Sequence, residues 1–116
     1  MAKILIVDDD PSILEAISLV LTRKNIDVVS LNDASTLQSA LREQEPDMLL
    51  MDIFMGIFDG RNLCREIKRS QTDIPVVLIS GHVVSNESVA ECYADALLIK
   101  PFRLNELYDV IEKFLH

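Results

Sequence analysis

Four short apolar runs in this chain each end in a polar residue, and this repetition constrains the fold more than any other feature. The runs cover residues 4–7, 48–51, 76–79 and 97–99, and they lead into Asp8-Asp9-Asp10, Asp52, Ser80 and Lys100. Continuous apolar runs of this length are typical of strands buried on both faces, as in a parallel sheet covered by helices. If the runs are parallel strands of one sheet, their carboxyl ends share an edge, and ligands bind in the crevice beyond that edge.

Helical patterns fill the gaps between the runs and predict an α/β fold. We expect strands at 3–7, 27–31, 48–52, 76–80 and 96–99. The first helix is expected to begin after Asp10, an N-cap that is followed by proline. Its expected core face is an apolar stripe of Ile13, Ile17, Val20 and Leu21. The other helices are expected to begin near Asp33, Asp59-Gly60, Ser85 or Asn86, and Leu104. Five strands alternating with helices predict a parallel sheet with helices on both faces, although the pattern alone does not give the strand order.

Composition narrows the functional classes. The chain has 116 residues, enough for one domain with a real core, and a net charge of −8 that repels phosphate backbones, so we expect no direct nucleic-acid binding by this domain. No apolar run approaches the roughly 20 residues of a membrane helix, and no signal peptide precedes the first strand, which favours a cytoplasmic protein. Cys64 and Cys92 lack metal-ligand spacing and are expected to be small, buried or half-buried hydrophobic residues in a reducing compartment.

The polar residues at the four strand ends suit phosphoryl chemistry. A carboxylate such as Asp52 can attack a phosphoryl group and form an aspartyl phosphate. Because neighbouring carboxylates repel each other and the incoming phosphate, such a site needs a cation, and Mg²⁺ or Mn²⁺ fits oxygen ligands of this kind.

Each of these residues receives a role in the predicted site. We expect Asp9 and Asp52 to bind the metal directly, Asp8 to bind it through water, and the backbone carbonyl of Phe54 to add an oxygen ligand. Lys100 would pair with a phosphoryl oxygen and Ser80 would donate its hydroxyl to another, so that position and electrostatics stabilise the transition state.

Taken singly, these residues have plainer interpretations. Asp10 reads as a helix cap, Asp52 as a strand-end carboxylate, Ser80 as a turn residue and Lys100 as a surface lysine. Their joint occurrence, each at the end of its own strand, favours the phosphate site.

With these residues at its strand ends, the chain resembles the receiver domain of response regulators in bacterial two-component signalling. The resemblance rests on ILIVDDD, on MLLMD followed seven residues later by Asp59-Gly60, on VVLISGH and on LLIKPF, and it covers the whole chain. It implies a single receiver domain over residues 1–116 with a doubly wound, flavodoxin-like sheet of order 2-1-3-4-5 and five helices in a three-layer sandwich. It also implies a cis bond between Lys100 and Pro101.

The resemblance implies a function as well. A sensor histidine kinase or a histidine phosphotransfer protein would pass a phosphoryl group to Asp52 in the presence of Mg²⁺, and the aspartyl phosphate would later be hydrolysed. Such a domain is not a conventional enzyme, since it catalyses only its own phosphorylation and slow dephosphorylation. Phosphorylation would shift the face built from the fourth helix, the last strand and the last helix, and so control a partner or an effector domain outside this chain, as a monomer or as a dimer promoted by phosphorylation.

Several positions depart from the family pattern. Leu97 stands where an aromatic residue usually couples to the serine, Tyr93 replaces a common glycine, and Gly56 replaces a common proline. Phe54 and His82 occupy the positions that tune phosphate lifetime in the family. We expect the bulky Phe54 to slow the loss of phosphate by hindering water, whereas His82 is either a proton donor or, as we favour, a surface loop residue.

The first helix suggests a docking surface. Leu14 and Leu19 fall beside or outside its core stripe, and together with Ile13 they would offer an apolar strip to a kinase or phosphotransfer helix pair. The alternative is a helix that packs more widely than the stripe indicates.

Three other functions are possible for an α/β chain with these residues, and the sequence disfavours each of them. A dehalogenase-like phosphatase would need an acid two residues after the nucleophile, where this chain has Phe54. A receiver-like binding module that never carries phosphate is disfavoured by the complete acidic set with Lys100. A flavodoxin relative is disfavoured because Asp8-Asp9-Asp10 would repel the flavin phosphate.

Overall fold

Five parallel strands form the centre of the computed structural model, which describes residues 2–70 and 73–115. The sheet order is β2-β1-β3-β6-β7, which is the predicted order 2-1-3-4-5 when these five strands are counted along the chain. Their bounds are those expected from the sequence: β1 Lys3–Val7, β2 Asp27–Leu31, β3 Met48–Asp52, β6 Val76–Ser80 and β7 Ala96–Ile99. Within the described residues, no helix is both long enough and apolar enough to cross a membrane.

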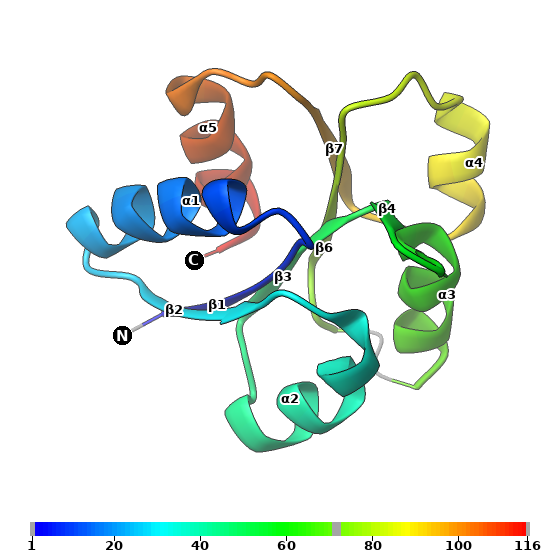
Figure 1. The fold of residues 1–116 in the computed structure, drawn as a ribbon, viewed down its shortest axis with the longest axis horizontal. Helices are drawn as coiled ribbons and strands as arrows, with labels where there is room; N and C mark the ends of the chain where they lie inside the picture. Colours follow the sequence, from blue (N-terminus) through cyan, green and yellow to red (C-terminus); the bar gives the residue numbers. More distant parts are fainter. Residues whose placement is uncertain (1, 71–72, 116) are drawn as a thin grey trace.

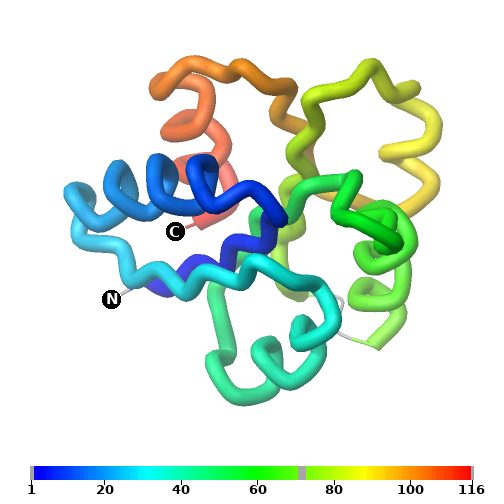
Figure 2. Tube along the Cα trace, in the orientation of Figure 1, coloured from blue at the N-terminus to red at the C-terminus, as the bar shows by residue number. Residues whose placement is uncertain are grey.

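Helices cover both faces of the sheet and complete three layers (Figure 1). One face carries α1 and α5, and the other carries α2, α3 and α4; the same arrangement can be followed along the chain in Figure 2. The helices are α1 Pro11–Arg23, α2 Leu37–Gln44, α3 Gly60–Ser70, α4 Asn86–Glu91 and α5 Leu104–Phe114. The doubly wound α/β prediction is therefore confirmed.

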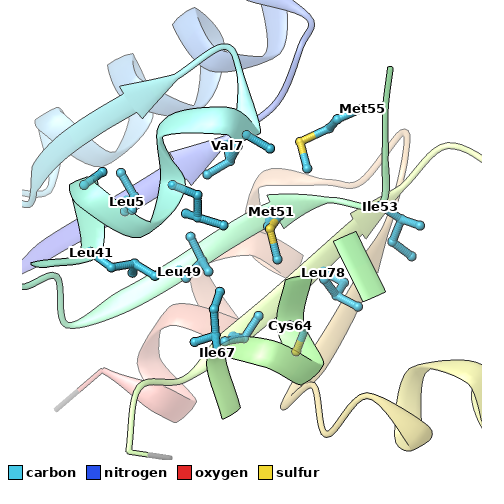
Figure 3. Packing of buried hydrophobic residues seen from close by; sticks show 14 of the residues in the cluster. Leu5, Val7, Leu41, Leu49, Met51, Ile53, Met55, Cys64, Ile67 and Leu78 are labelled. Atoms are coloured by element: carbon cyan, nitrogen blue, oxygen red, sulfur yellow. The ribbon is translucent and has the colours of Figure 1, made fainter. Parts of the chain in front are cut away.

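Side chains along each central strand alternate between two cores, which explains the continuous apolar runs. On the α2 and α3 side, β1 and β3 place Leu5, Val7, Leu49 and Met51 (Figure 3). On the α1 and α5 side, they place Ile4, Ile6, Met48 and Leu50. A strand with both faces covered has no polar side to present, so its sequence lacks the alternation of a half-exposed strand.

Capping residues largely agree with the sequence analysis. The Asp10 carboxylate accepts a hydrogen bond from the Ser12 amide at 2.9 Å and caps α1, and Ser85 in turn caps α4. Asp33 caps a short 3-10 helix, η1 Ala34–Thr36, so α2 begins only at Leu37. Cys64 and Cys92 are buried as expected.

The core face of α1 differs from the predicted one. Leu14, Ile17 and Leu21 are its buried residues, whereas Ile13 and Val20 are half-buried. The expectation that Leu14 lies beside or outside the core is therefore wrong, while Leu19 is indeed exposed. The reason is that α1 packs on the sheet with α5 beside it, so the apolar stripe is rotated toward the 14, 17, 21 row.

A small hairpin follows β3 that the sequence pattern did not indicate. Its strands, β4 Phe54–Met55 and β5 Phe58–Asp59, are antiparallel, and Gly56 in the turn between them has φ of 59°. Glycine reaches this left-handed region without a Cβ penalty. Proline, whose φ is fixed near about −65°, could not take the place of Gly56 without remodelling the turn.

Candidate functional site

Three carboxylates meet at the carboxyl edge of the sheet. Asp8 and Asp9 follow β1, and Asp52 is the last residue of β3, the strand beside β1. One carboxylate oxygen from each lies within 4.8 Å of the others. Asp8 is completely buried, Asp52 is 6% exposed and Asp9 is exposed, so the group opens to solvent on the Asp9 side.

Lys100 brings a positive charge to the same place. It follows β7, and its Nζ donates a hydrogen bond to Asp8 Oδ2 at 3.0 Å and lies 3.7 Å from Asp52 Oδ1. The other Asp8 oxygen accepts a hydrogen bond from the Asp10 amide at 2.9 Å. Burial of the Asp8 charge is thus compensated by an ion pair and a backbone donor. The bond between Lys100 and Pro101 is cis, as predicted.

Ser80 ends β6 and is completely buried at this edge. Its hydroxyl donates to the His82 carbonyl at 2.8 Å and accepts from the His82 amide at 3.0 Å. The register pairs Ile79 of β6 with Asp52 of β3, which brings the end of β6 beside the carboxylates. In this conformation the hydroxyl holds the loop after β6.

The pKa of Asp52 is strongly perturbed. Burial and the nearby charge of Asp8 raise this pKa from 3.8 to about 6, against the lowering effect of Lys100. Desolvation and like charge both disfavour the ionised form, whereas a cation at the site would favour it. Positive charge in addition to that of Lys100 would therefore lower the pKa of Asp52 and stabilise its ionised form.

The residues present fit a divalent cation such as Mg²⁺. Carboxylate oxygens from three residues are the hard ligands that this ion prefers, and an exposed Asp9 leaves room for the waters that Mg²⁺ keeps. The roles of Asp8, Asp9 and Asp52 as ligands, and of the Phe54 carbonyl, stay predictions.

The rings of Phe54 and His82 contact each other near the site, since Phe54 lies two residues after Asp52 and the His82 backbone binds Ser80. Their rings are T-shaped with centroids 5.1 Å apart, and they come from the two loops that follow β3 and β6. The Arg61 guanidinium lies 5.4 Å from the Phe54 centroid. Sequence analysis did not single out Arg61, because its contact with Phe54 depends on the unpredicted hairpin; its spacing of two residues from Asp59 was the available signal.

Two other predicted positions lie outside the carboxylate group. Leu97 in β7 is half-buried and packs against the core on the α2 and α3 side. Ile13 lines an apolar groove of about 540 Å³ between α1 and α5, together with Val20, Pro101 and Leu104. Lys100 also lines this groove, so the groove and the carboxylate site share one residue.

Close packing between the start of α3 and the end of β3 requires glycine at position 60. A Cβ built on this residue would collide with the backbone carbonyl oxygen of Asp52, and the Gly60 amide donates to the Ile53 carbonyl at 2.6 Å. Glycine allows α3 to begin directly against the end of β3.

Gly60→Ala is expected to lower the free energy of unfolding by about 2 kcal/mol, because the added methyl must push backbone rather than a flexible side chain. Urea unfolding followed by circular dichroism measures the change. Gly81→Ala is the matched control, since a Cβ there meets only the Lys100 side chain at 3.8 Å. Equal effects of the two substitutions would contradict the steric explanation.

Comparison with known proteins places the chain among signalling proteins. Residues 4–112 match the family model of the response regulator receiver domain. The chain is 34% identical over 107 residues to the DNA-binding response regulator MtrA of Mycolicibacterium smegmatis, a match that covers 90% of this chain and 46% of MtrA. The chain thus spans less than half the length of such curated relatives.

Solved structures agree with this result. The BeF3-activated N-terminal receiver domain of Klebsiella pneumoniae RstA superposes with a TM-score of 0.89 at 27% identity, over 98% of each chain. The response regulator TrrA of Thermotoga maritima, solved in complex with Mg²⁺-BeF, has a TM-score of 0.91 at 23% identity, over 99% of this chain and 100% of that one. The second likeness shows the fold alone.

Proposed function

Because the chain belongs to the response regulator receiver family, we propose that it accepts a phosphoryl group on Asp52. The observation that carries this proposal is the meeting of Asp52 with Asp8, Asp9 and Lys100 in one partly buried site at the carboxyl edge of the sheet. Receivers are signalling proteins rather than conventional enzymes. Residues 1–116 would act as one such receiver domain, in the cytoplasm that is typical of response regulators.

The chemical step is a transfer between two nucleophiles. An Asp52 oxygen attacks the phosphorus of a phosphohistidine on a sensor histidine kinase or a histidine phosphotransfer protein. The P–O bond to Asp52 forms, the P–N bond breaks, and its electron pair leaves with the histidine nitrogen. Attack requires ionised Asp52, which its raised pKa makes costly without added positive charge.

Charge neutralisation at the site follows from the residues around Asp52. Asp9, Asp52 and the Phe54 carbonyl would hold Mg²⁺ or Mn²⁺, with Asp8 binding through water, and the ion would supply neutralising charge when bound. Lys100, which lies 3.7 Å from Asp52, would pair with a phosphoryl oxygen.

Ser80 would connect phosphorylation to a change of shape. Its hydroxyl binds both backbone groups of His82, and donation to a phosphoryl oxygen would break the bond to the His82 carbonyl. The loop between β6 and α4 would then favour a second conformation and shift the face formed by α4, β7 and α5. Leu97 is half-buried in β7, so the shift would pass through packing and backbone rather than through an aromatic rotamer.

The apolar groove between α1 and α5 is our proposed docking surface for the kinase or phosphotransfer helices. Ile13 lines it, whereas Leu14 is buried and is not among the residues that line it, so only Ile13 of the two offers side-chain surface there. Relatives named as DNA-binding response regulators support an output through an effector domain or partner, and a phosphorylation-promoted dimer is one form that it could take.

Intact-protein mass after incubation with acetyl phosphate tests the proposal. We expect one phosphoryl adduct of wild type that requires Mg²⁺ and that is absent from Asp52→Ala. Asp109→Ala, which removes an exposed carboxylate on α5, should leave the adduct unchanged. A wild type that forms no adduct with acetyl phosphate or with a phosphorylated kinase would indicate a binding module instead. Continuous phosphate release without an adduct would indicate a phosphatase.

A further inference from the structure

Arg61 connects three parts of the molecule around the candidate site. Its guanidinium binds both Asp59 oxygens, with Nη2 to Oδ2 at 2.7 Å and Nε to Oδ1 at 3.0 Å. Its Nη1 donates to the Ser88 hydroxyl of α4 at 3.3 Å. The same guanidinium lies 5.4 Å from the centre of the Phe54 ring. One side chain at the start of α3 thus contacts the hairpin after β3 and also α4.

The contacts continue from Phe54 to the buried serine. The edge-on contact of Phe54 with His82 joins the loop after β3 to the loop after β6. The His82 backbone in turn holds the Ser80 hydroxyl through two hydrogen bonds. Phe54 is 41% exposed, so burial restrains its ring only in part, and the contacts with Arg61 and His82 add to that restraint.

A guanidinium suits this position better than an ammonium would. Its planar fork matches the Asp59 carboxylate, and the fixed plane leaves a face for an aromatic ring. The bidentate pair with Arg61 holds the pKa of Asp59 below its ordinary value, so the carboxylate that orients Arg61 stays charged at neutral pH.

We propose that Arg61 is a positioning residue that holds Phe54 against His82, so that the two rings cover the mouth of the Asp52 site and prolong the life of the aspartyl phosphate. This inference rests on the proposed phosphorylation of Asp52. In hydrolysis, a water oxygen bonds to phosphorus as the P–O bond to Asp52 breaks. The products are the Asp52 carboxylate and inorganic phosphate, and the water proton passes to phosphate or to solvent. Arg61 acts on this step through the ring that limits access of water.

The test follows the decay of the adduct by intact-protein mass. Protein is phosphorylated with acetyl phosphate, desalted, and incubated with Mg²⁺. We expect Phe54→Ala to lose phosphate faster than wild type, and Arg61→Ala to lose it about threefold faster, as loss of an exposed cation–aromatic contact predicts. Arg61→Lys should resemble Arg61→Ala, because a lysine retains the charge but not the planar fork.

A double-mutant cycle separates positioning from a general effect on structure. In the Phe54→Ala background, Arg61→Ala should change the decay rate by less than 1.5-fold, or about 0.2 kcal/mol, since its target ring is gone. Arg65→Ala is the matched control, because it removes the same charge from α3 and its side chain contacts Asn62 instead. Its decay rate should equal that of wild type.

The outcomes distinguish this inference from the proposed function. An adduct that forms on Asp52 but decays equally in wild type and Arg61→Ala would overturn the role of Arg61 and leave the phosphoacceptor intact. The same acceleration in both backgrounds would show that Arg61 acts independently of Phe54, and would also overturn it. A wild type that forms no adduct would overturn both proposals. Unfolding midpoints of all variants, measured in parallel, confirm that each decay rate belongs to a folded protein.

Discussion

Lys100→Met is expected to slow formation of the Asp52 adduct by about 10²-fold or more. The Lys100 ammonium lies 3.0 Å from Asp8 and 3.7 Å from Asp52. In the proposed transfer, negative charge would develop on phosphoryl oxygens at this place. Removing one preorganised donor from a charged transition state costs about 10²- to 10³-fold in rate. Methionine keeps the length of the side chain, so the substitution removes the charge rather than the packing. The rate is measured by intact-protein mass with acetyl phosphate at saturating Mg²⁺.

Lys24→Met provides the control for this prediction. Lys24 caps the far end of α1, and its ammonium lies 4.6 Å from the centre of the Tyr108 ring. The substitution Lys24→Met removes the same charge far from the site. The 13 residues of α1 span about 20 Å, and Lys24 lies at the end of α1 opposite to the carboxyl edge of the sheet. A Lys100→Met protein that is folded and phosphorylated at the wild-type rate would refute the proposed role of Lys100.

Asp52→Asn is expected to stabilise the metal-free protein by about 3 kcal/mol at pH 7. Burial and Asp8 raise the pKa of Asp52 from 3.8 to about 6, and each pKa unit corresponds to about 1.4 kcal/mol. Asparagine has the shape of aspartate without its charge, so it removes the cost of ionising a buried carboxylate beside Asp8. Under the proposed function the wild type would retain this cost because an ionised Asp52 would be the nucleophile.

The pKa of Asp52 also sets how the stability difference between Asp52→Asn and wild type depends on pH. Between pH 4 and pH 6 the folded protein keeps the Asp52 proton that the unfolded chain has released, so the stability contributed by this group falls as pH rises. Well below pH 3.8 both states are protonated and the cost disappears, whereas well above pH 6 both are ionised and the cost is constant. The advantage of Asp52→Asn should therefore shrink from about 3 kcal/mol at pH 7 to about 0.6 kcal/mol at pH 4.

Urea unfolding in EDTA at several pH values measures this effect. Asp109→Asn, which neutralises an exposed carboxylate on α5, should change stability by less than about 0.5 kcal/mol at either pH. Adding Mg²⁺ should reduce the advantage of Asp52→Asn, since a bound cation favours ionised Asp52. If Asp52→Asn is no more stable than wild type at pH 7, ionisation of Asp52 does not lower the stability of the folded protein, and the prediction is wrong.

The strands and the composition of the site were predictable because both follow from local chemistry. Strands covered on both faces, such as β1 and β3, must be apolar throughout, and their carboxyl ends must meet when they run parallel. Asp8, Asp52, Ser80 and Lys100 therefore could be placed at one edge before any coordinates were known. The cis bond at Pro101 and the strand order came instead from resemblance to a family.

Tertiary packing decided the features that no local pattern encodes. Leu14 faces the core because of the angle at which α1 meets the sheet and α5, and a helical stripe does not specify that angle to within one residue. Two strands of two residues each are too short for a periodic signal, so the hairpin after β3 was missed.

Arg61 shows the same division between local and tertiary information. Its pairing with Asp59 is local and could be read from a spacing of two residues, whereas its contacts with Phe54 and Ser88 exist only once the hairpin and α4 have packed beside α3. The sequence by itself determined which charges gather at the edge of the sheet, because strand direction brings them there. Only the tertiary structure decided which side chains surround those charges, because contacts between separate elements depend on how the elements pack.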